Sequence, residues 1–121
     1  MGSVEAESLR QRTKRFALLV VKLSQQLPNG REARVIGDQL LRAGTAVAAN
    51  YRAACRGRSR AEFIAKLGIV VEEADETLFW CELLEEAGIV AHHDIQEVAG
   101  EAKELLAIFA TARKTAKSRS A

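Results

Sequence analysis

The 121-residue chain contains little of what a β-rich or membrane-spanning protein needs. It has one proline and six aromatic residues, while alanine, leucine, valine, glutamate and arginine dominate. This composition favours a helical bundle over a β-sandwich or β-barrel. No apolar run approaches the roughly 18 residues that cross a bilayer, and the N-terminal segment does not resemble a secretory signal. We therefore expect a cytoplasmic protein without membrane contact.

The chain also lacks the motifs that accompany common catalytic sites. It has no glycine-rich phosphate loop, no nucleophile elbow and no Cys-x-x-Cys pair. Di-metal carboxylate bundles need Glu-x-x-His pairs on their helices, but His92 and His93 are adjacent and lie in a connecting segment. Together with Asp94 they could hold a surface metal ion, although a polar helix start is the simpler interpretation. We expect no enzymatic activity, no cofactor and no metal.

The two cysteines, Cys55 and Cys81, are too far apart in a helical hairpin to form a disulfide. If the chain folds back near residue 58, Cys55 lies opposite about residue 61. Cys81 then lies about 20 residues farther on, or ~30 Å along the helix. A disulfide needs Cα atoms within about 7 Å. We predict that the two cysteines form no disulfide within the chain and that both are small apolar core or interface residues.

Apolar residues recur every three to four positions in four segments, which predicts four amphipathic helices. The predicted helices span about residues 5–26, 32–56, 60–87 and 94–114. Because the connecting segments are short, successive helices should be antiparallel neighbours. Residues 1–121 are therefore expected to form a single domain, an all-α, up-down-up-down antiparallel four-helix bundle. A long helical hairpin with two flanking helices is the alternative packing.

Helix-end signals support these boundaries. Two pairs have the spacing of a capping box, in which the first side chain accepts a hydrogen bond from the third helical residue: Ser59 with Glu62, and Asp94 with Glu97. Gly57 and Gly88 are placed to terminate the second and third helices. Residues 117–121 are expected to fray.

The charges are distributed unevenly along the chain. Residues 67–105 hold eleven acidic residues and one lysine, whereas the segments on either side are basic. In an up-down-up-down bundle, both termini and the bend near residue 58 share one end. The opposite end would be acidic and include Glu101 and Glu104. The basic end would gather candidate contacts for a nucleic-acid backbone: Arg12, Arg15, Arg52, Arg56, Arg58, Arg60, Arg113 and Lys114.

The same cations have a purely structural interpretation. Positive side chains near helix C-termini complement the helix dipole, and solvated arginines are ordinary surface residues. Few aromatic residues lie among them, so any nucleic-acid contact should involve the backbone or its shape rather than the base sequence.

Two polar residues are predicted to fix the packing of the second helix. Antiparallel pairing places Arg42 level with about residue 75, so we expect it to clamp the helices by pairing with Asp75 or Glu76. If this ion pair is buried, the cost of desolvating both charges offsets most of their attraction. The pair would then specify how the helices pack more than it would stabilise the fold. Asn50 lies among small residues, and a buried asparagine must find partners and can set helix register. We favour that role over ligand binding.

The first and third helices carry more apolar surface than one core seam requires. In a four-helix monomer each helix keeps a polar outer face, yet Leu18, Phe79 and Trp80 fall outside the core stripes. An oligomer interface is the preferred interpretation, and a wide core stripe is the alternative.

One extended motif resembles a known family. Its parts are QLLRAGTAVAAN from Gln39 to Asn50, Arg58-Ser59, Glu62-Phe63 and Glu76-Thr77. Together they resemble the bacterial 23S rRNA intervening-sequence protein family, a four-helix bundle family, from about Leu9 to Phe109. The chain departs from the family pattern at three positions: Ala48 replaces a frequent proline, Ala53 a glutamate, and Ala54 a glycine.

The resemblance implies a bundle that assembles as a ring-shaped homopentamer. The related accessory variability determinants of diversity-generating retroelements bind reverse transcriptase and nucleic acid through a basic pentamer surface. We therefore expect a non-enzymatic oligomeric binding or assembly protein that contacts RNA, DNA or a nucleic-acid-processing partner through its cationic end. The alternative is a structural protein–protein interaction module that does not bind nucleic acid.

Overall fold

The computed structural model describes residues 3–120, which form four helices and no strand. The helices are α1 (Val4–Gln25), α2 (Arg31–Cys55), α3 (Arg60–Glu86) and α4 (His92–Ser120). The predicted all-α class and helix number are confirmed. The predicted fraying after residue 116 is wrong for the described residues, because α4 continues to Ser120. Residue 121 lies outside the described residues.

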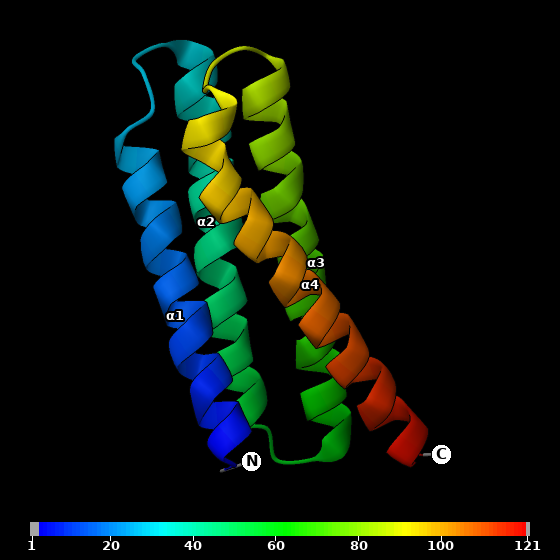
Figure 1. The fold of residues 1–121 in the computed structure, drawn as a ribbon. Helices are drawn as coiled ribbons and strands as arrows, with labels where there is room; N and C mark the ends of the chain where they lie inside the picture. Colours follow the sequence, from blue (N-terminus) through cyan, green and yellow to red (C-terminus); the bar gives the residue numbers. More distant parts are fainter. Residues whose placement is uncertain (1–2, 121) are drawn as a thin grey trace.

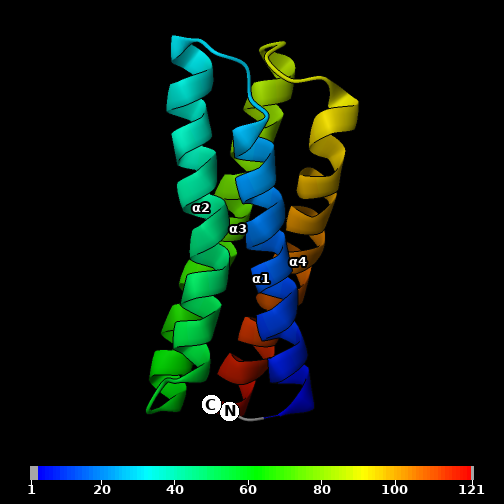
Figure 2. The ribbon, with the colours of Figure 1, turned by 90° about the vertical axis from the view of Figure 1, so that its left-hand side faces the viewer.

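The helices run in alternating directions (Figures 1 and 2). The α1–α2 and α3–α4 connections lie at one end, while the α2–α3 turn and both termini lie at the other, which we call the turn end. Helix α1 packs on α2 and α4, and α3 also packs on α2 and α4, so α1 and α3 are diagonal partners. Towards the turn end, α4 leans away from α1 (Figure 1).

Specific hydrogen bonds define both ends of α3. The Ser59 hydroxyl accepts from the backbone N–H of Glu62 at 3.1 Å, as a capping residue should. The Glu62 carboxylate accepts from the N–H of Arg58 at 3.2 Å, whereas a reciprocal capping box would use Ser59. At the other end Gly88 adopts a φ of 74°, and Ile89 N–H donates to the Leu84 carbonyl at 3.0 Å. That closure is a Schellman motif, which favours glycine at this position.

The predicted capping box at the start of α4 is wrong. Helix α4 begins at His92, so Asp94 already lies in its first turn. The Asp94 N–H donates to the Ala91 carbonyl at 3.0 Å, and the carboxylate complements the positive end of the helix dipole from within the helix. Gly57 likewise follows α2 without adopting left-handed backbone.

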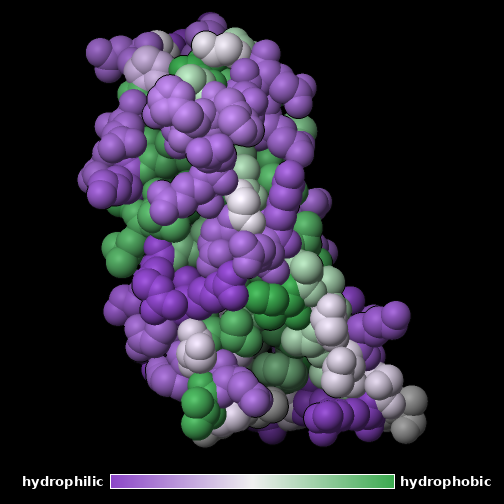
Figure 3. All heavy atoms as spheres, viewed as in Figure 1, coloured by the Kyte–Doolittle hydropathy of each residue, from purple (hydrophilic) through white to green (hydrophobic). Residues whose placement is uncertain are grey.

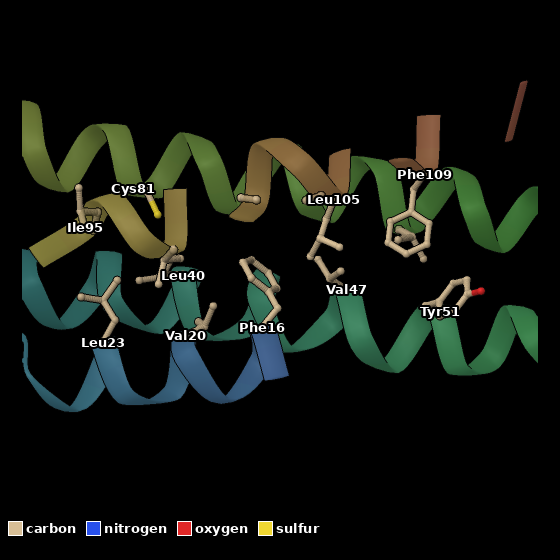
Figure 4. Close-up of a cluster of buried hydrophobic side chains, with 14 of the residues drawn as sticks. Phe16, Val20, Leu23, Leu40, Val47, Tyr51, Cys81, Ile95, Leu105 and Phe109 are labelled. Carbon is tan, nitrogen blue, oxygen red and sulfur yellow. The ribbon is translucent and has the colours of Figure 1, made fainter. Parts of the chain in front are cut away.

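A single core runs along the bundle axis (Figure 4). Tyr51 of α2 and Phe109 of α4 are both buried, with ring centroids 4.8 Å apart. The prediction that the two cysteines do not form a disulfide is confirmed. Cys81 is buried and Cys55 is half-buried. Burial raises the pKa of Cys81 to about 12, so this thiol is an inert packing group.

Candidate nucleic-acid interface

Seven exposed cationic side chains lie at or near the turn end. They come from the last turn of α2, the α2–α3 turn, the first residue of α3 and the last turns of α4. We call them the cationic end: Arg52, Arg56, Arg58, Arg60, Lys114, Lys117 and Arg119. Within residues 3–120, none of them forms an ion pair with a carboxylate.

Few carboxylates offset this charge. Glu5, Glu7 and Glu62 are the acidic residues in the helical turns nearest to the turn end. Glu7 pairs with Arg10 at 3.1 Å, and Glu62 accepts from the backbone of Arg58. The turn end therefore presents guanidinium and ammonium groups whose hydrogen-bond donors are available to an external anion.

Arg12 does not belong to the cationic end, contrary to the sequence-based prediction. Its guanidinium bridges α1 to α4, with Nε 2.7 Å from Glu101 Oε2 and Nη2 3.0 Å from Glu104 Oε1. The hydrogen bonding that Arg12 donates to the Glu101 carboxylate is the largest cause of the raised Arg12 pKa. The prediction that these two glutamates lie at the acidic end is also wrong, because they neutralise an arginine partway along the bundle.

Two more candidate cations have other surroundings. Arg113 is half-buried, and its Nε donates to the Ile64 carbonyl at 3.3 Å, so it ties α4 to α3. Arg15 lines a hollow between α1 and α4 together with Leu18, and Glu97 and Glu101 also contribute to that hollow. The remaining candidates, Arg52, Arg56, Arg58, Arg60 and Lys114, are exposed members of the cationic end.

The surface of the turn end has two hollows. The turn pocket, about 550 Å³, lies between the α2–α3 turn and α4, and its lining includes Arg58, Arg60 and Arg119. The α1–α2 groove, about 640 Å³, is lined by the basic residues Arg10, Lys14, Arg52 and Arg56 and by small residues such as Ala48. The turn end is therefore a contoured cationic surface with two concave sites.

Sequence reasoning missed an aromatic residue in this region. Phe63 is half-buried and lines the turn pocket beside its arginines. The sequence signal for this placement is the position of Phe63 in the first turn of α3, directly after the arginine-rich segment. The structure therefore brings an aromatic side chain to a surface for which few aromatic residues were predicted.

The structure confirms one of the predicted polar contacts of α2 and overturns the other. The prediction is that Arg42 pairs with Asp75 or Glu76, and it pairs with Glu76 and also with Glu73, the latter at 3.1 Å. The Arg42 side chain is 48% exposed, so this clamp lies at the surface and carries no large desolvation cost. The predicted register role of Asn50 is wrong, because its side-chain N–H donates to the Ala46 carbonyl of the same helix at 2.9 Å.

The candidate interface residues lie on opposite sides of the bundle. Leu18 of α1 is 60% exposed and Phe79 of α3 is 50% exposed. Trp80 is half-buried against Phe79, with ring centroids 4.9 Å apart, and its indole N–H donates to Glu76 at 3.0 Å. On the face in Figure 3, hydrophobic residues are also visible between hydrophilic ones in the lower half of the bundle.

The described residues hold no group of three or more histidine, cysteine or acidic side chains that could bind a metal ion. The two adjacent histidines make separate contacts: His92 with Glu85 at 3.0 Å, and His93 with Asp94 at 3.1 Å. None of the helices within residues 3–120 has the length and apolarity that crossing a bilayer requires.

These features define a small all-α protein of four helices with one cationic end. Residues 7–111 match the 23S rRNA-intervening sequence protein family, and the chain belongs to that family. It is also similar to a solved structure from Bacteroides thetaiotaomicron, described as a protein with unknown function from the S23 ribosomal protein family. The two are 31% identical, with a TM-score of 0.84 and coverage of 92% of this chain and 99% of that chain. A search of the curated proteins found no match.

Proposed function

We propose that this protein is a non-enzymatic, oligomeric assembly protein of the cytoplasm that contacts an RNA or DNA backbone through its cationic end. The supporting observation is the set of seven exposed cationic side chains near the turn end without carboxylate partners in residues 3–120. Such a set attracts phosphates at a rate and strength that depend on salt. Contacts of this kind position a backbone and do not read its sequence.

The shape of the turn end supports a long polyanion over a single small anion. The α1–α2 groove carries Arg52 and Arg56 along one side of α2, while the turn pocket carries Arg58 and Arg60 on the other. A nucleic-acid backbone that crosses the end of α2 would meet both sets in succession. A free phosphate would engage only one of them.

We further propose that the protein forms a homopentameric ring, as the family resemblance implies. The exposed Leu18 and Phe79 lie on α1 and α3, which are diagonal in the bundle. A twofold interface made by one patch would leave the other in water. Head-to-tail contact buries both patches, and it forms a ring when the rotation between successive subunits closes. In such a ring every subunit presents its cationic end in the same direction, which multiplies the positive field.

Filter binding at low salt tests the backbone contact. The variant R52Q/R56Q/R58Q should lose most RNA retention, whereas R31Q/R34Q/K103Q should retain it. The control removes the same number of exposed positive charges outside the cationic end, and these also form no ion pair with a carboxylate among residues 3–120. Failure of the wild-type protein to retain RNA or DNA at low salt would exclude this function. The structural interaction module would then be favoured, and a protein partner should remain in a pull-down after nuclease treatment.

A further inference from the structure

The turn pocket differs from the rest of the cationic end because its charges surround an apolar floor. Three arginines contribute to its lining: Arg58, Arg60 and Arg119. Its other walls come from the hydroxyl residues Ser59 and Thr115, from the ring of Phe63, and from three alanines, Ala54, Ala112 and Ala116. Its volume of about 550 Å³ falls within the range of about 300–1,000 Å³ that is typical of small-ligand sites.

We propose that the turn pocket holds one nucleotide of a single-stranded nucleic acid. The base lies against Phe63 and the alanine floor, and the adjoining phosphate binds the three arginines. This inference rests on the proposed backbone contact and extends it, because it gives the protein a preference for unpaired strands. It requires no base-specific hydrogen bond, so all four bases are acceptable.

The composition of the pocket favours a nucleotide over other anions. Guanidinium groups bind phosphate in a bidentate manner, but a bare phosphate would leave the apolar floor in contact with water. An acidic peptide segment has the charge without a flat apolar group to cover Phe63. A nucleotide supplies both parts, and stacking on aromatic side chains tolerates any base because each base has a π-face.

The pocket also discriminates between single strands and duplexes. A base inside a duplex is paired and stacked, and extruding it costs a few kcal/mol. An unpaired strand offers its bases without that cost. The nearby Glu62 does not occupy the arginine side chains, because its carboxylate accepts from the backbone N–H of Arg58. A strand that leaves the pocket across α2 then meets Arg56 and Arg52 in the α1–α2 groove.

Fluorescence anisotropy with the full-length protein tests this proposal. Three labelled probes of equal length are compared at low salt: a mixed-sequence single-stranded DNA, the same strand with sugars that carry no bases, and the duplex. The wild-type protein should bind the base-carrying strand about fivefold or more tightly than the abasic strand. It should also prefer that strand over the duplex.

Two variants of the pocket should abolish this preference. F63L removes the aromatic face but keeps an apolar side chain, and T115L narrows the pocket from an exposed position on α4. T111L is the matched control, since Thr111 is the same residue type, exposed and one turn earlier on α4, and does not line the pocket. T111L should bind all three probes as the wild-type protein does. Helicity measured by circular dichroism verifies that each variant is folded.

Equal wild-type binding of the base-carrying and abasic strands would overturn the nucleotide pocket, as would unchanged preference in T115L. A glutamate peptide that displaces the strand from the wild-type protein but not from T115L would assign the pocket to an acidic protein segment, and would also overturn it. In these cases the backbone contact still stands if R52Q/R56Q/R58Q weakens binding of every probe. If the wild-type protein binds none of the probes at low salt, the proposed function itself fails.

Discussion

Arg12 of α1 and Glu101 of α4 form a two-pronged ion pair, with Nε–Oε2 and Nη2–Oε1 distances of 2.7 and 2.8 Å. Their side chains are 31% and 20% exposed, which places the pair at the margin of the core. The two residues are 89 positions apart in the sequence, and their contact links the first helix to the last. The planar fork of arginine matches both carboxylate oxygens, which a lysine could not do.

A double-mutant cycle on this pair should give a coupling free energy of about 1 kcal/mol. R12Q and E101Q should each destabilise the fold, and the double variant should cost less than the sum of the two. Urea denaturation of the four proteins measures the coupling. R34Q is a suitable control, because Arg34 is exposed and forms no ion pair with a carboxylate within residues 3–120. Additivity of R12Q and E101Q would show that the pair does not stabilise the bundle.

The carboxylate of Glu76 should make stability and tryptophan fluorescence depend on pH. Its hydrogen bond from Trp80, together with Arg42, lowers its pKa from the ordinary value of 4.5. The folded state therefore favours the ionised form. Its contribution is complete above pH 4.5 and is lost as pH falls through the lowered pKa of the folded state.

Trp80 is the only tryptophan of the chain, so its emission reports this titration directly. The wild-type protein should show a fluorescence transition with a midpoint below pH 4.5. E76Q should lack the transition, and its stability deficit should shrink at acid pH. E72Q serves as the control, because Glu72 is an exposed residue of the same helix. A transition that persists in E76Q would contradict this assignment.

Gly44 should resist substitution by alanine, because α1 and α2 approach closely at this residue. A Cβ atom at position 44 would lie 2.6 Å from Val20 Cγ2, and overpacking of this kind costs about 1–3 kcal/mol. Alanine has a better helix propensity than glycine, which stabilises the helix by about 1 kcal/mol. The net effect of G44A on the free energy of unfolding should therefore be destabilising.

Gly100 provides the matched comparison for Gly44, since a Cβ there meets nothing within 4 Å. G100A should raise the melting temperature, G44A should lower it, and V20A should offset part of the effect of G44A. Stabilisation by G44A would show that the two helices can move apart at no cost.

The proposed ring makes a prediction that a twofold dimer does not. If Leu18 of one subunit contacts the region of Phe79 on the next, L18E and F79E should each be monomeric. An equimolar mixture should form a heterodimer, because one intact copy of each patch remains. Native mass spectrometry of the separate and mixed proteins measures the assembly. If either variant alone retains the wild-type assembly size, that residue lies outside the interface.

The helices and much of the core could be predicted because their signals are local. Phe16, Val20 and Leu23 follow the helical repeat, and each is buried. Helix α4 extends beyond its predicted end because residues 115–120 contain no glycine or proline to stop the helix. Alanine, lysine and arginine are good helix formers, so the helix continues beyond the last residues of the apolar stripe.

The polar contacts between helices are harder to predict. They depend on the rotation of each helix about its own axis and on its tilt, as well as on the position of each residue along the bundle. Antiparallel pairing correctly brought Arg42 to the level of residue 75. However, adjacent residues on a helix point about 100° apart, and the structure selects Glu73 and Glu76. The Arg12–Glu101 pair depends on how α4 crosses the bundle, for which the sequence has no local signal.

The salt dependence of binding to single-stranded RNA tests the role of the cationic end most directly. The logarithm of the association constant should fall linearly with the logarithm of salt concentration, with a slope of about −0.7 per neutralised phosphate. R52Q/R56Q/R58Q should make this slope shallower by about 2, whereas R31Q/R34Q/K103Q should leave it unchanged. Identical slopes for the wild-type protein and both variants would contradict the assignment of the cationic end as the nucleic-acid contact.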